Sequence, residues 1–313
     1  MNVITKELLT GTHNNGDTIS GLILLREVKR QVTKNGKPYF SGIVCSGVDV
    51  YIKAWDNSSA FKFLERENVE GKVVYISGNW NEYQGQLSIV LDSVMSNEET
   101  ISMDAMQFIP SRYNIDAYWG GLHQIMSQNL SENGMKLANA FLFENEEVAN
   151  AFKVEFAAKS HHDNCKGGLL AHTYKICYIM QVVFSLYKDI ADKDVCMLGA
   201  LLHDVGKVKE MHMGVYQPCS KVTHRFLGIE MLDKDLIVSL YSEEWYYELV
   251  SVLLQHHGEW GDPCKTVSAR IVNLVDEFEA NAMLLKQAIE LSDNSGTVNV
   301  NGQYLSYMPL QEV

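Results

Sequence analysis

The chain has 313 residues, of which 46% are hydrophobic and 21% charged, which is typical of a globular protein rather than a disordered one. At roughly 150 residues per domain, this length favours about two domains. No run reaches the about 18 apolar residues of a membrane span, and the first residues lack the apolar core of a secretory signal. The six cysteines form no CxxC pair, so they indicate reduced thiols in a cytoplasmic protein.

The net charge of −13 is unevenly divided along the chain. Residues 1–100 carry 10 basic and 12 acidic side chains, whereas the remaining residues carry 16 and 27. A pI near 5.2 argues against tight nonspecific binding of duplex nucleic acid, which depends on counterion release. It does not exclude nucleic acid as a substrate, because bound cations can offset the local field.

The first hundred residues predict a small β-barrel. Five runs rich in Val, Ile, Tyr and Phe predict strands over residues 18–32, 38–45, 48–55, 72–78 and 86–95. Asn35-Gly36 predicts a hairpin turn between the first two strands, and Ser58 predicts the start of a short helix after the third. Five strands with this helix position are the element order of an OB-fold, which often binds single strands, although SH3-like barrels give a similar pattern.

Single-strand binding needs aromatic side chains on which bases stack and basic side chains along the path of the backbone. The barrel sequence offers both kinds at Arg30, Lys34, Lys37, Tyr39, Phe40, Tyr51, Lys53, Trp55, Trp80 and Tyr83. Each aromatic in this set is more often a core residue of the barrel than a contact. Tyr51 is the better candidate, because it falls on the polar face of its predicted strand.

The sequence predicts a barrel domain over residues 1–100, a linker over 101–118 and a helical domain over 119–313. A polar stretch beginning at Ser96 and the later Pro110 mark the linker. From Trp119 onward, apolar residues recur three and four apart. The clearest helical runs cover residues 168–187, 194–203, 243–257 and 267–290. The second domain is therefore predicted to be nearly all α.

Eight of the ten histidines fall between residues 161 and 257. His203-Asp204 ends an apolar predicted helix and so offers an imidazole and a carboxylate side by side. His172 and Asp276 fall on apolar helix faces, where an unpaired polar group is costly. A lone helical histidine is more often structural than a ligand, but this clustering favours a metal site. Mixed His/Asp ligation without thiolates suits Mn, Fe, Zn, Co or Ni and does not choose between them.

The order of these residues resembles a known signature. His172, His203-Asp204 followed by Gly206-Lys207, and Asp276 resemble the H…HD…D pattern of the HD-domain metal-dependent phosphohydrolases. The additional residues His224 and His256-His257 resemble the branch that holds two metals. With His161-His162 upstream and an OB-like domain before them, the chain is similar over nearly its whole length to the YhaM-type 3′→5′ exoribonucleases. It departs from the expected pattern at Asn273 and Glu279.

The resemblance implies a multidomain β + α protein, with a five-stranded OB-like barrel followed by an all-α HD-domain bundle. It implies two divalent ions, Mn²⁺ foremost and Fe, Co, Ni, Zn or Mg as alternatives. Their ligands would be His172, His203, Asp204, His224, His256, His257 and Asp276, with Asp204 bridging. Two such ions, about 3.5–4 Å apart, activate a water and clamp phosphate oxygens.

Other roles follow from the same resemblance and from residue chemistry. Lys207 would steady developing phosphate charge, although an ordinary exposed lysine at a helix end is equally compatible with its position. His161 or His162 would protonate the leaving oxygen or orient a phosphate. Arg225 and Arg270 are candidate phosphate contacts, and each is more often an ordinary surface residue.

The leading hypothesis is a metal-dependent 3′→5′ exonuclease that degrades single-stranded RNA, and DNA as a second substrate. The expected partner is single-stranded nucleic acid, with no membrane and with self-association into a homo-oligomer. One alternative is an HD-type phosphohydrolase of small nucleotides; its cyclic-di-GMP subclass is disfavoured, because Gly258-Glu259-Trp260 replaces the GYP string. Another alternative is a non-catalytic single-strand-binding protein.

Overall fold

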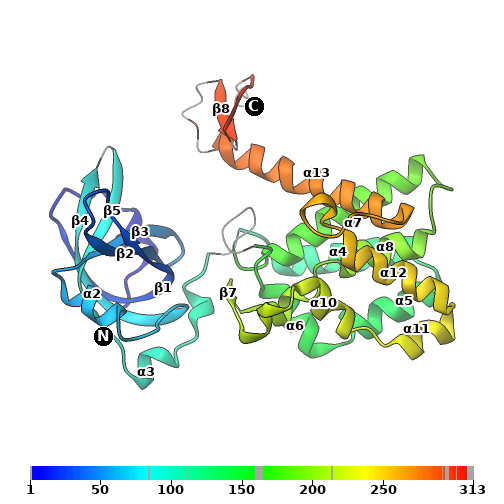
Figure 1. Ribbon diagram of the computed structural model, residues 1–313, viewed down its shortest axis with the longest axis horizontal. Helices are drawn as coiled ribbons and strands as arrows, with labels where there is room; N and C mark the ends of the chain where they lie inside the picture. Colours follow the sequence, from blue (N-terminus) through cyan, green and yellow to red (C-terminus); the bar gives the residue numbers. More distant parts are fainter. Residues whose placement is uncertain are drawn as a thin grey trace. The chain divides into compact units, whose positions relative to one another are not determined.

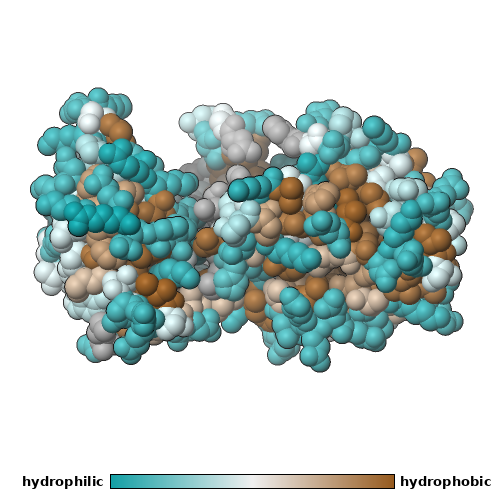
Figure 2. Space-filling model, turned by 60° about the horizontal axis from the view of Figure 1, so that its bottom comes forward, coloured by the Kyte–Doolittle hydropathy of each residue, from teal (hydrophilic) through white to brown (hydrophobic). Residues whose placement is uncertain are grey.

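The computed structural model describes residues 2–83, 85–110, 112–158, 165–212, 214–290, 292, 296–300 and 302–308. The chain divides into two compact units, here called the barrel unit (Met1–Ser111) and the helical unit (Arg112–Val313). Each unit has a hydrophobic core of its own. Hydrophilic residues cover much of the visible surface, and apolar residues gather in separate areas between them (Figure 2).

The barrel unit is a closed barrel with the strand order β1-β2-β3-β5-β4 (Figure 1). Its strands are β1 (Thr18–Val32), β2 (Pro38–Cys45), β3 (Asp49–Trp55), β4 (Lys72–Tyr83) and β5 (Gln86–Met95). β3 and β5 pair in parallel, and the other neighbours pair antiparallel. Helix α2 (Ser59–Leu64) follows β3 and is capped by Ser58. This arrangement confirms the OB-like barrel.

Alternation along the strands sets which side chains enter the barrel. Ile52 and Ala54 are buried, whereas Tyr51 and Lys53 of the same strand point outward. Gly36 has a φ of +79° in the turn after β1, as the predicted hairpin requires. β4 continues past its predicted end at residue 78, because Asn79 and Asn81, which look like turn residues, pair with β5.

A β-bulge interrupts the long first strand between Arg26 and Lys29. Glu27 there has a φ of +55°, which is rare for a residue other than glycine. The Glu70 carboxylate accepts hydrogen bonds of 2.8 Å from the backbone N–H groups of both Glu27 and Val28. These bonds offset the strain and satisfy the donors that the bulge leaves unpaired. β1 can therefore bend at this point and pair with β4 on one side and β2 on the other.

The predicted linker over residues 101–118 is wrong for most of its length. Helix α3 (Glu98–Ile101) and the 3₁₀ turn η1 (Ala105–Gln107) belong to the barrel unit. Phe108 is buried, and its carbonyl accepts a hydrogen bond from the Gly47 N–H at 2.7 Å. α4 begins at Ile115. The polar residues that suggested a linker are capping residues, since Asn97 forms a capping box with Thr100.

A further short helix of the barrel unit, α1 (Lys6–Thr10), precedes its first strand.

The helical unit packs its helices around α8, of which every residue from Val195 to Leu202 is buried. The helices of the helical unit are α4 (Ile115–Asn129), α5 (Glu132–Ala138), α6 (Glu146–Val154), α7 (Gly168–Leu186), α8 (Lys193–Leu202), α9 (Lys207–Glu210), α10 (His224–Glu230), α11 (Lys234–Leu240), α12 (Glu243–Gln255) and α13 (Val267–Glu290). Shorter turns are η2 (Asn139–Phe143), η3 (Pro218–Lys221) and η4 (Gly258–Trp260).

By length and composition alone, α7 could cross a membrane, and it is the one such helix in the ranges given above. The sequence analysis found no such run, because His172, Thr173 and Lys175 interrupt the apolar residues. Half of the stretch is buried inside the protein, where Leu169 and Ile176 join the core. α7 is therefore accounted for as a core helix of this unit.

Two small antiparallel sheets show that the helical unit is not all-α. β6 (Met211–His212) pairs with β7 (Val215–Tyr216) just before the helix that carries His224. β8 (Thr297–Val300) pairs with β9 (Gln303–Ser306) after α13. The sequence analysis predicted neither hairpin, because strands of two to four residues are too short to show a period.

Candidate metal centre

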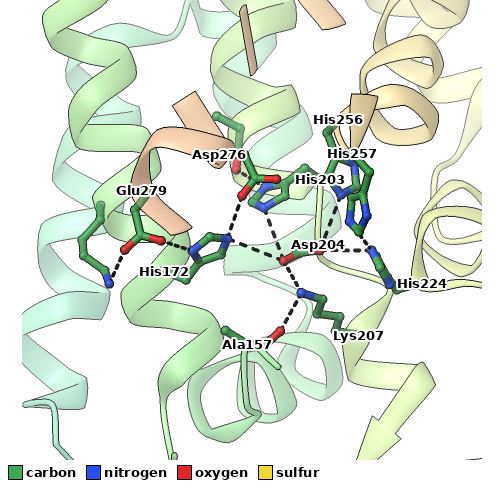
Figure 3. Close-up of polar contacts among 12 residues, drawn as sticks. Ala157, His172, His203, Asp204, Lys207, His224, His256, His257, Asp276 and Glu279 are labelled. Carbon is green, nitrogen blue, oxygen red and sulfur yellow. Dashed lines mark hydrogen bonds and ion pairs between the residues drawn. The ribbon is translucent and has the colours of Figure 1, made fainter. Parts of the chain in front are cut away.

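Five segments of the helical unit bring imidazole and carboxylate groups together in its interior (Figure 3). Because α8 is buried from Val195 to Leu202, its C-terminal end delivers the following residues into the core. The groups that meet are His172 of α7, His203 and Asp204 after α8, His224 at the start of α10, His256 and His257 after α12, and Asp276 of α13. These are the seven side chains that the sequence nominated as ligands.

Asp204 lies in the middle of the cluster. Its Oδ2 lies 3.4 Å from Nε2 of His203 and 3.8 Å from Nε2 of His172. Its Oδ1 lies 3.3 Å from Nε2 of His224 and 3.7 Å from Nε2 of His256. The two oxygens therefore face two different sets of imidazoles, which is the arrangement of a carboxylate able to bridge two ions.

The remaining two nominated residues complete the two sets. One group consists of Asp204, His224, His256 and His257, whose ligand atoms all lie within 4.8 Å of one another. The ligand atoms of His172, His203 and Asp204 form a second group of the same compactness. Asp276 places its Oδ1 3.2 Å from Nε2 of His172. Ligand atoms that are each about 2.1 Å from one ion lie about 3–3.5 Å apart, so these separations suit divalent cations.

Three buried atoms of the cluster lack a hydrogen-bond partner among the described residues. They are Nε2 of His203, Nε2 of His256 and Oδ1 of Asp204. A buried polar atom left unsatisfied costs about 1–3 kcal/mol, so three together need an explanation. All three face the centre of the cluster and carry lone pairs, which makes them suited to a cation and poorly suited to one another.

Two histidines are oriented by the backbone carbonyls of their own helices. Nδ1 of His203 lies 2.8 Å from the Ala200 carbonyl oxygen, and Nδ1 of His256 lies 3.0 Å from that of Leu253. A neutral ring that donates its Nδ1–H to a carbonyl has its lone pair at Nε2. Both rings are therefore fixed with Nε2 toward the cluster.

Two further histidines are oriented by carboxylates that the sequence analysis did not nominate. Nδ1 of His172 lies 2.5 Å from Oε2 of Glu279, and Nδ1 of His224 lies 3.1 Å from Oε2 of Glu210. Lys175 forms an ion pair with the other oxygen of Glu279. Such outer carboxylates fix the ring of a metal-binding histidine. A usable signal existed, since Glu279 follows Asp276 by three residues and shares its helix face.

The charges of the cluster set its pKa values. Burial opposes protonation of His172, but its hydrogen bonds and charge contacts with Asp276 and Glu279 outweigh burial and raise its pKa to about 10. A cation that binds at Nε2 must displace this proton. Burial lowers the pKa of His257 to about 4 and, helped by the charge of His203, holds that of His256 well below its usual range. These two rings are therefore neutral ligands at neutral pH.

The carboxylates of the cluster stay ionised despite their burial. Burial alone would raise the pKa of Asp204, but Lys207 and His203 outweigh it and hold the pKa well below its usual range. The same balance, with His172 as the largest favourable partner, lowers the pKa of Asp276 and of Glu279. The centre therefore presents ionised carboxylates and the neutral imidazoles of His256 and His257, the two kinds of donor that divalent transition metals bind.

Lys207 contacts the cluster directly. Its Nζ donates hydrogen bonds of 2.6 Å to Oδ2 of Asp204 and to the carbonyl oxygen of Ala157. In this position it neutralises and orients the bridging carboxylate. The sequence analysis placed it toward the phosphate or in solvent, and its side chain is only 14% exposed.

Gly206 is required by a close approach of two backbones. Its φ is −63°, which any residue can adopt, so the glycine is not needed for its backbone conformation. A Cβ at this position would lie 1.9 Å from the His224 carbonyl oxygen and 2.5 Å from the Gly228 nitrogen. The turn after Asp204 therefore packs directly against α10.

The predicted phosphate contacts have partners inside the protein. Arg225 donates from NH1 to the Leu254 carbonyl at 2.6 Å and to Asp262 at 2.9 Å. Arg270 donates to Oδ1 of Asn273, whose Nδ2 donates to the His256 carbonyl at 2.7 Å. Asn273, noted earlier as a departure from the family pattern, thus holds the backbone of a nominated ligand.

The nominated catalytic residues His161 and His162 lie outside the described residues. Their predicted roles stay predictions.

On the barrel unit, the outer face of β2 and β3 gathers several predicted nucleic-acid contacts. The rings of Tyr39 and Trp55 lie 5.2 Å apart, and these residues are register partners. Tyr51 and Tyr83 are 58% and 62% exposed, and Lys53 lies 6.0 Å over the Tyr83 ring. The face therefore offers flat apolar rings beside a cation, as single-strand binding requires.

Other predicted contacts lie elsewhere. Trp80 is 2% exposed and stacks on His13, and Phe40 packs against Phe61 in the core, so neither can receive a base. Their strand positions point inward, which the aromatic composition alone could not show. Arg30 forms an exposed ion pair with Glu65, and Lys34 and Lys37 are exposed at the β1–β2 turn.

Comparison with known proteins gives a consistent result. Residues 169–281 match the family model described as the HD domain, and this range contains all seven nominated ligands. The chain is similar to the "3'-5' exoribonuclease YhaM" of Oceanobacillus iheyensis, at 26% identity over 88% of each chain. It is also similar to the protein of the same name from Bacillus subtilis, at 25% identity over 89% of this chain and 90% of the relative.

A solved structure also aligns with part of the chain. It is the mitochondrial single-stranded DNA-binding protein Rim1 from S. cerevisiae, which covers 26% of this chain and 94% of its own at 18% identity. The TM-score is 0.22, too low for any conclusion.

Proposed function

We propose that this protein is a metal-dependent 3′→5′ exonuclease that degrades single-stranded RNA. The observation that carries the proposal is the convergence of seven histidine and aspartate side chains with Asp204 at their centre, three of whose buried lone-pair atoms lack a hydrogen-bond partner among the described residues. The HD-domain match covers these residues, and relatives along about 88% of the chain are named 3′-5′ exoribonucleases.

In this proposal the residues of the cluster would hold two divalent ions, with Asp204 as a ligand common to both. His172, His203 and Asp276 complete one set, and His224, His256 and His257 complete the other. When bound, such ions activate a water and neutralise the charge of the phosphodiester. Glu279 and Glu210 orient the rings of His172 and His224 through their Nδ1 atoms.

Lys207 holds the bridging carboxylate in place through its two hydrogen bonds. His161 or His162 delivers a proton to the leaving oxygen or orients the phosphate, and Arg225 and Arg270 come within reach of the strand. The barrel unit grips the strand through Tyr51, Lys53, Trp55 and Tyr83, helped by Arg30, Lys34 and Lys37.

Further parts of the proposal concern the ion, the compartment and self-association. Mn²⁺ is the proposed ion, because the resemblance to the YhaM-type exoribonucleases favours it; the mixed imidazole and carboxylate ligation without thiolate suits Mn²⁺ as it does Fe, Zn, Co or Ni. All six cysteines are free, which supports a reducing cytoplasmic location. The protein is proposed to form a homo-oligomer, and its mass in solution by light scattering tests this.

The experiment uses single-stranded RNA and DNA labelled at the 5′ end, incubated with Mn²⁺ or with EDTA. The expected result is stepwise shortening from the 3′ end that needs the metal and is lost in a His203→Ala, Asp204→Ala double variant. A panel of free nucleotides in parallel tests the small-molecule alternative. Cleavage that survives EDTA or the double substitution would falsify the proposal.

A further inference from the structure

A surface groove lies beside the metal centre, between α7 and α13. Its volume is about 380 Å³, which is within the range of small-ligand sites. The residues that matter for its chemistry are Tyr174, Lys175, Tyr178, Phe278, Glu279 and Lys286. None of them was singled out as a binding residue by the sequence analysis.

The groove exposes aromatic rings. Tyr178 is 50% exposed and Phe278 is 63% exposed, one on each helix that forms the groove. The Tyr178 ring is stacked with that of Tyr174 at 6.4 Å, and Tyr174 packs edge-on against Tyr118 at 4.9 Å. The inner rings therefore hold Tyr178 in place from behind. Exposed, supported aromatic faces are what unpaired bases stack on, with little dependence on sequence.

The groove also carries positive charge, in a part of the chain that is strongly acidic overall. Lys286 lies at the groove and is 66% exposed, with an ion pair to Glu290 of 3.8 Å. So exposed a pair contributes little, and Lys286 can therefore exchange Glu290 for a phosphate. Lys175 lies on the other helix and neutralises Glu279. The exposed rings and the lysines of the groove together fit a nucleotide strand, with its bases and phosphates, better than they fit an uncharged apolar partner.

The groove and the metal centre share a residue. Glu279 lines the groove, and its Oε2 contacts Nδ1 of His172 at 2.5 Å. Asp276, one turn earlier on the same helix, contacts Nε2 of that histidine. A nucleotide in the groove would therefore lie on the Nδ1 side of the His172 ring, whose Nε2 faces the metal centre.

We infer that this groove binds the bases of single-stranded RNA next to the terminal nucleotide, by stacking on Tyr178 and Phe278, while Lys286 contacts the phosphate. This inference rests on the proposed function and adds a second strand-binding site, separate from the barrel surface. It explains how an acidic helical unit holds the end of a strand: stacking supplies the attraction that net charge cannot.

The test measures degradation of a tetranucleotide with Mn²⁺ by the full-length protein. Tyr178→Ala and Phe278→Ala should each raise KM about tenfold, because loss of one stacked base costs about 1–3 kcal/mol. Tyr178→Phe and Phe278→Tyr keep the ring and should restore the wild-type KM. Tyr247→Ala removes an exposed tyrosine of α12 and is the matched control, with KM unchanged. The metal content of every variant is measured to show that the centre is intact.

A second readout is photo-crosslinking of a tetranucleotide with 4-thiouridine next to its 3′ end, followed by mass spectrometry. Crosslinks to peptides of α7 and α13 around the groove support the inference. If the wild-type protein degrades RNA but the alanine variants keep its KM, or if the crosslinks fall elsewhere, the groove assignment is wrong. If the wild-type protein degrades no RNA, the proposed function fails, and the crosslinks still decide whether the groove binds bases.

Discussion

The two units differ in where they place their candidate functional residues, on the surface of the barrel unit and in the interior of the helical unit. The barrel unit keeps its candidate contacts on an outer face, where Tyr51 and Tyr83 are exposed. The helical unit buries its histidines and carboxylates, so each needs a partner in a defined place. The barrel surface can tolerate the loss of one ring, whereas the metal centre depends on every member, and on Asp204 above all.

The largest expected effect is that of Asp204→Asn. The change keeps the shape of the side chain but removes the charge that faces four imidazoles. Turnover should fall by more than about three orders of magnitude, and both ions should be lost together. Steady-state rates and elemental analysis of the purified protein measure this. Asp235→Asn, an exposed position in α11, is the control; retention of one ion by Asp204→Asn would contradict the bridging assignment.

Trp80→Ala should have the next largest effect, on the stability of the barrel unit. Removal of a buried tryptophan from the core should lower the free energy of unfolding by about 3–5 kcal/mol. Thermal or urea unfolding checks this, with Trp55→Ala on the outer face as the comparison. The metal content should not change, because the two cores share no residues. A small loss of stability with a large loss of RNA binding would instead restore Trp80 as a contact.

Glu279→Gln should weaken metal binding without abolishing it. The amide cannot hold the His172 ring as the carboxylate does, and loss of such an outer partner costs about 10–100-fold in metal affinity. Competition with a chelator measures the affinity. Glu290→Gln changes an exposed glutamate of the same helix and should behave like the wild type. Equal affinities in the two variants would show that Glu279 only supports packing.

The smallest effect is expected on the barrel surface. Tyr51→Ala combined with Tyr83→Ala should raise KM about tenfold for a strand of about thirty nucleotides. The rise should be smaller for a tetranucleotide, because it offers fewer nucleotides for the barrel surface to contact. Fluorescence anisotropy with the long strand gives the same ranking. An unchanged KM for the long strand would place these tyrosines outside the path of the strand.

The barrel was predictable because its information is local. The ends of β1, β2 and β5 agree with the predicted runs, since alternation along one strand decides which side chains are buried. The prediction of element ends failed where contacts with other parts of the chain outweighed the local amino-acid composition. Asn79 and Asn81 continue β4, and Phe108 turns a predicted linker into part of the core.

The metal centre was predictable only in part. Order along the chain nominated the ligands through a resemblance, and the structure brings all seven together. Glu210 and Glu279 were missed, because their roles come from contacts across the fold with His224 and His172. The need for glycine at position 206 also comes from a contact across the fold, because a Cβ there would meet the backbone of α10.

The contact at Gly206 has a mechanical consequence. Main-chain atoms touch there, so the spacing between the His203-Asp204 turn and the His224 helix is set by peptide groups that have no alternative rotamers. The His203-Asp204 turn and the first turn of α10, which carries His224, are thus held at a fixed separation. Substitutions elsewhere can loosen the side chains around this contact. Even one added methyl group at Gly206 would instead push the His203-Asp204 turn away from α10.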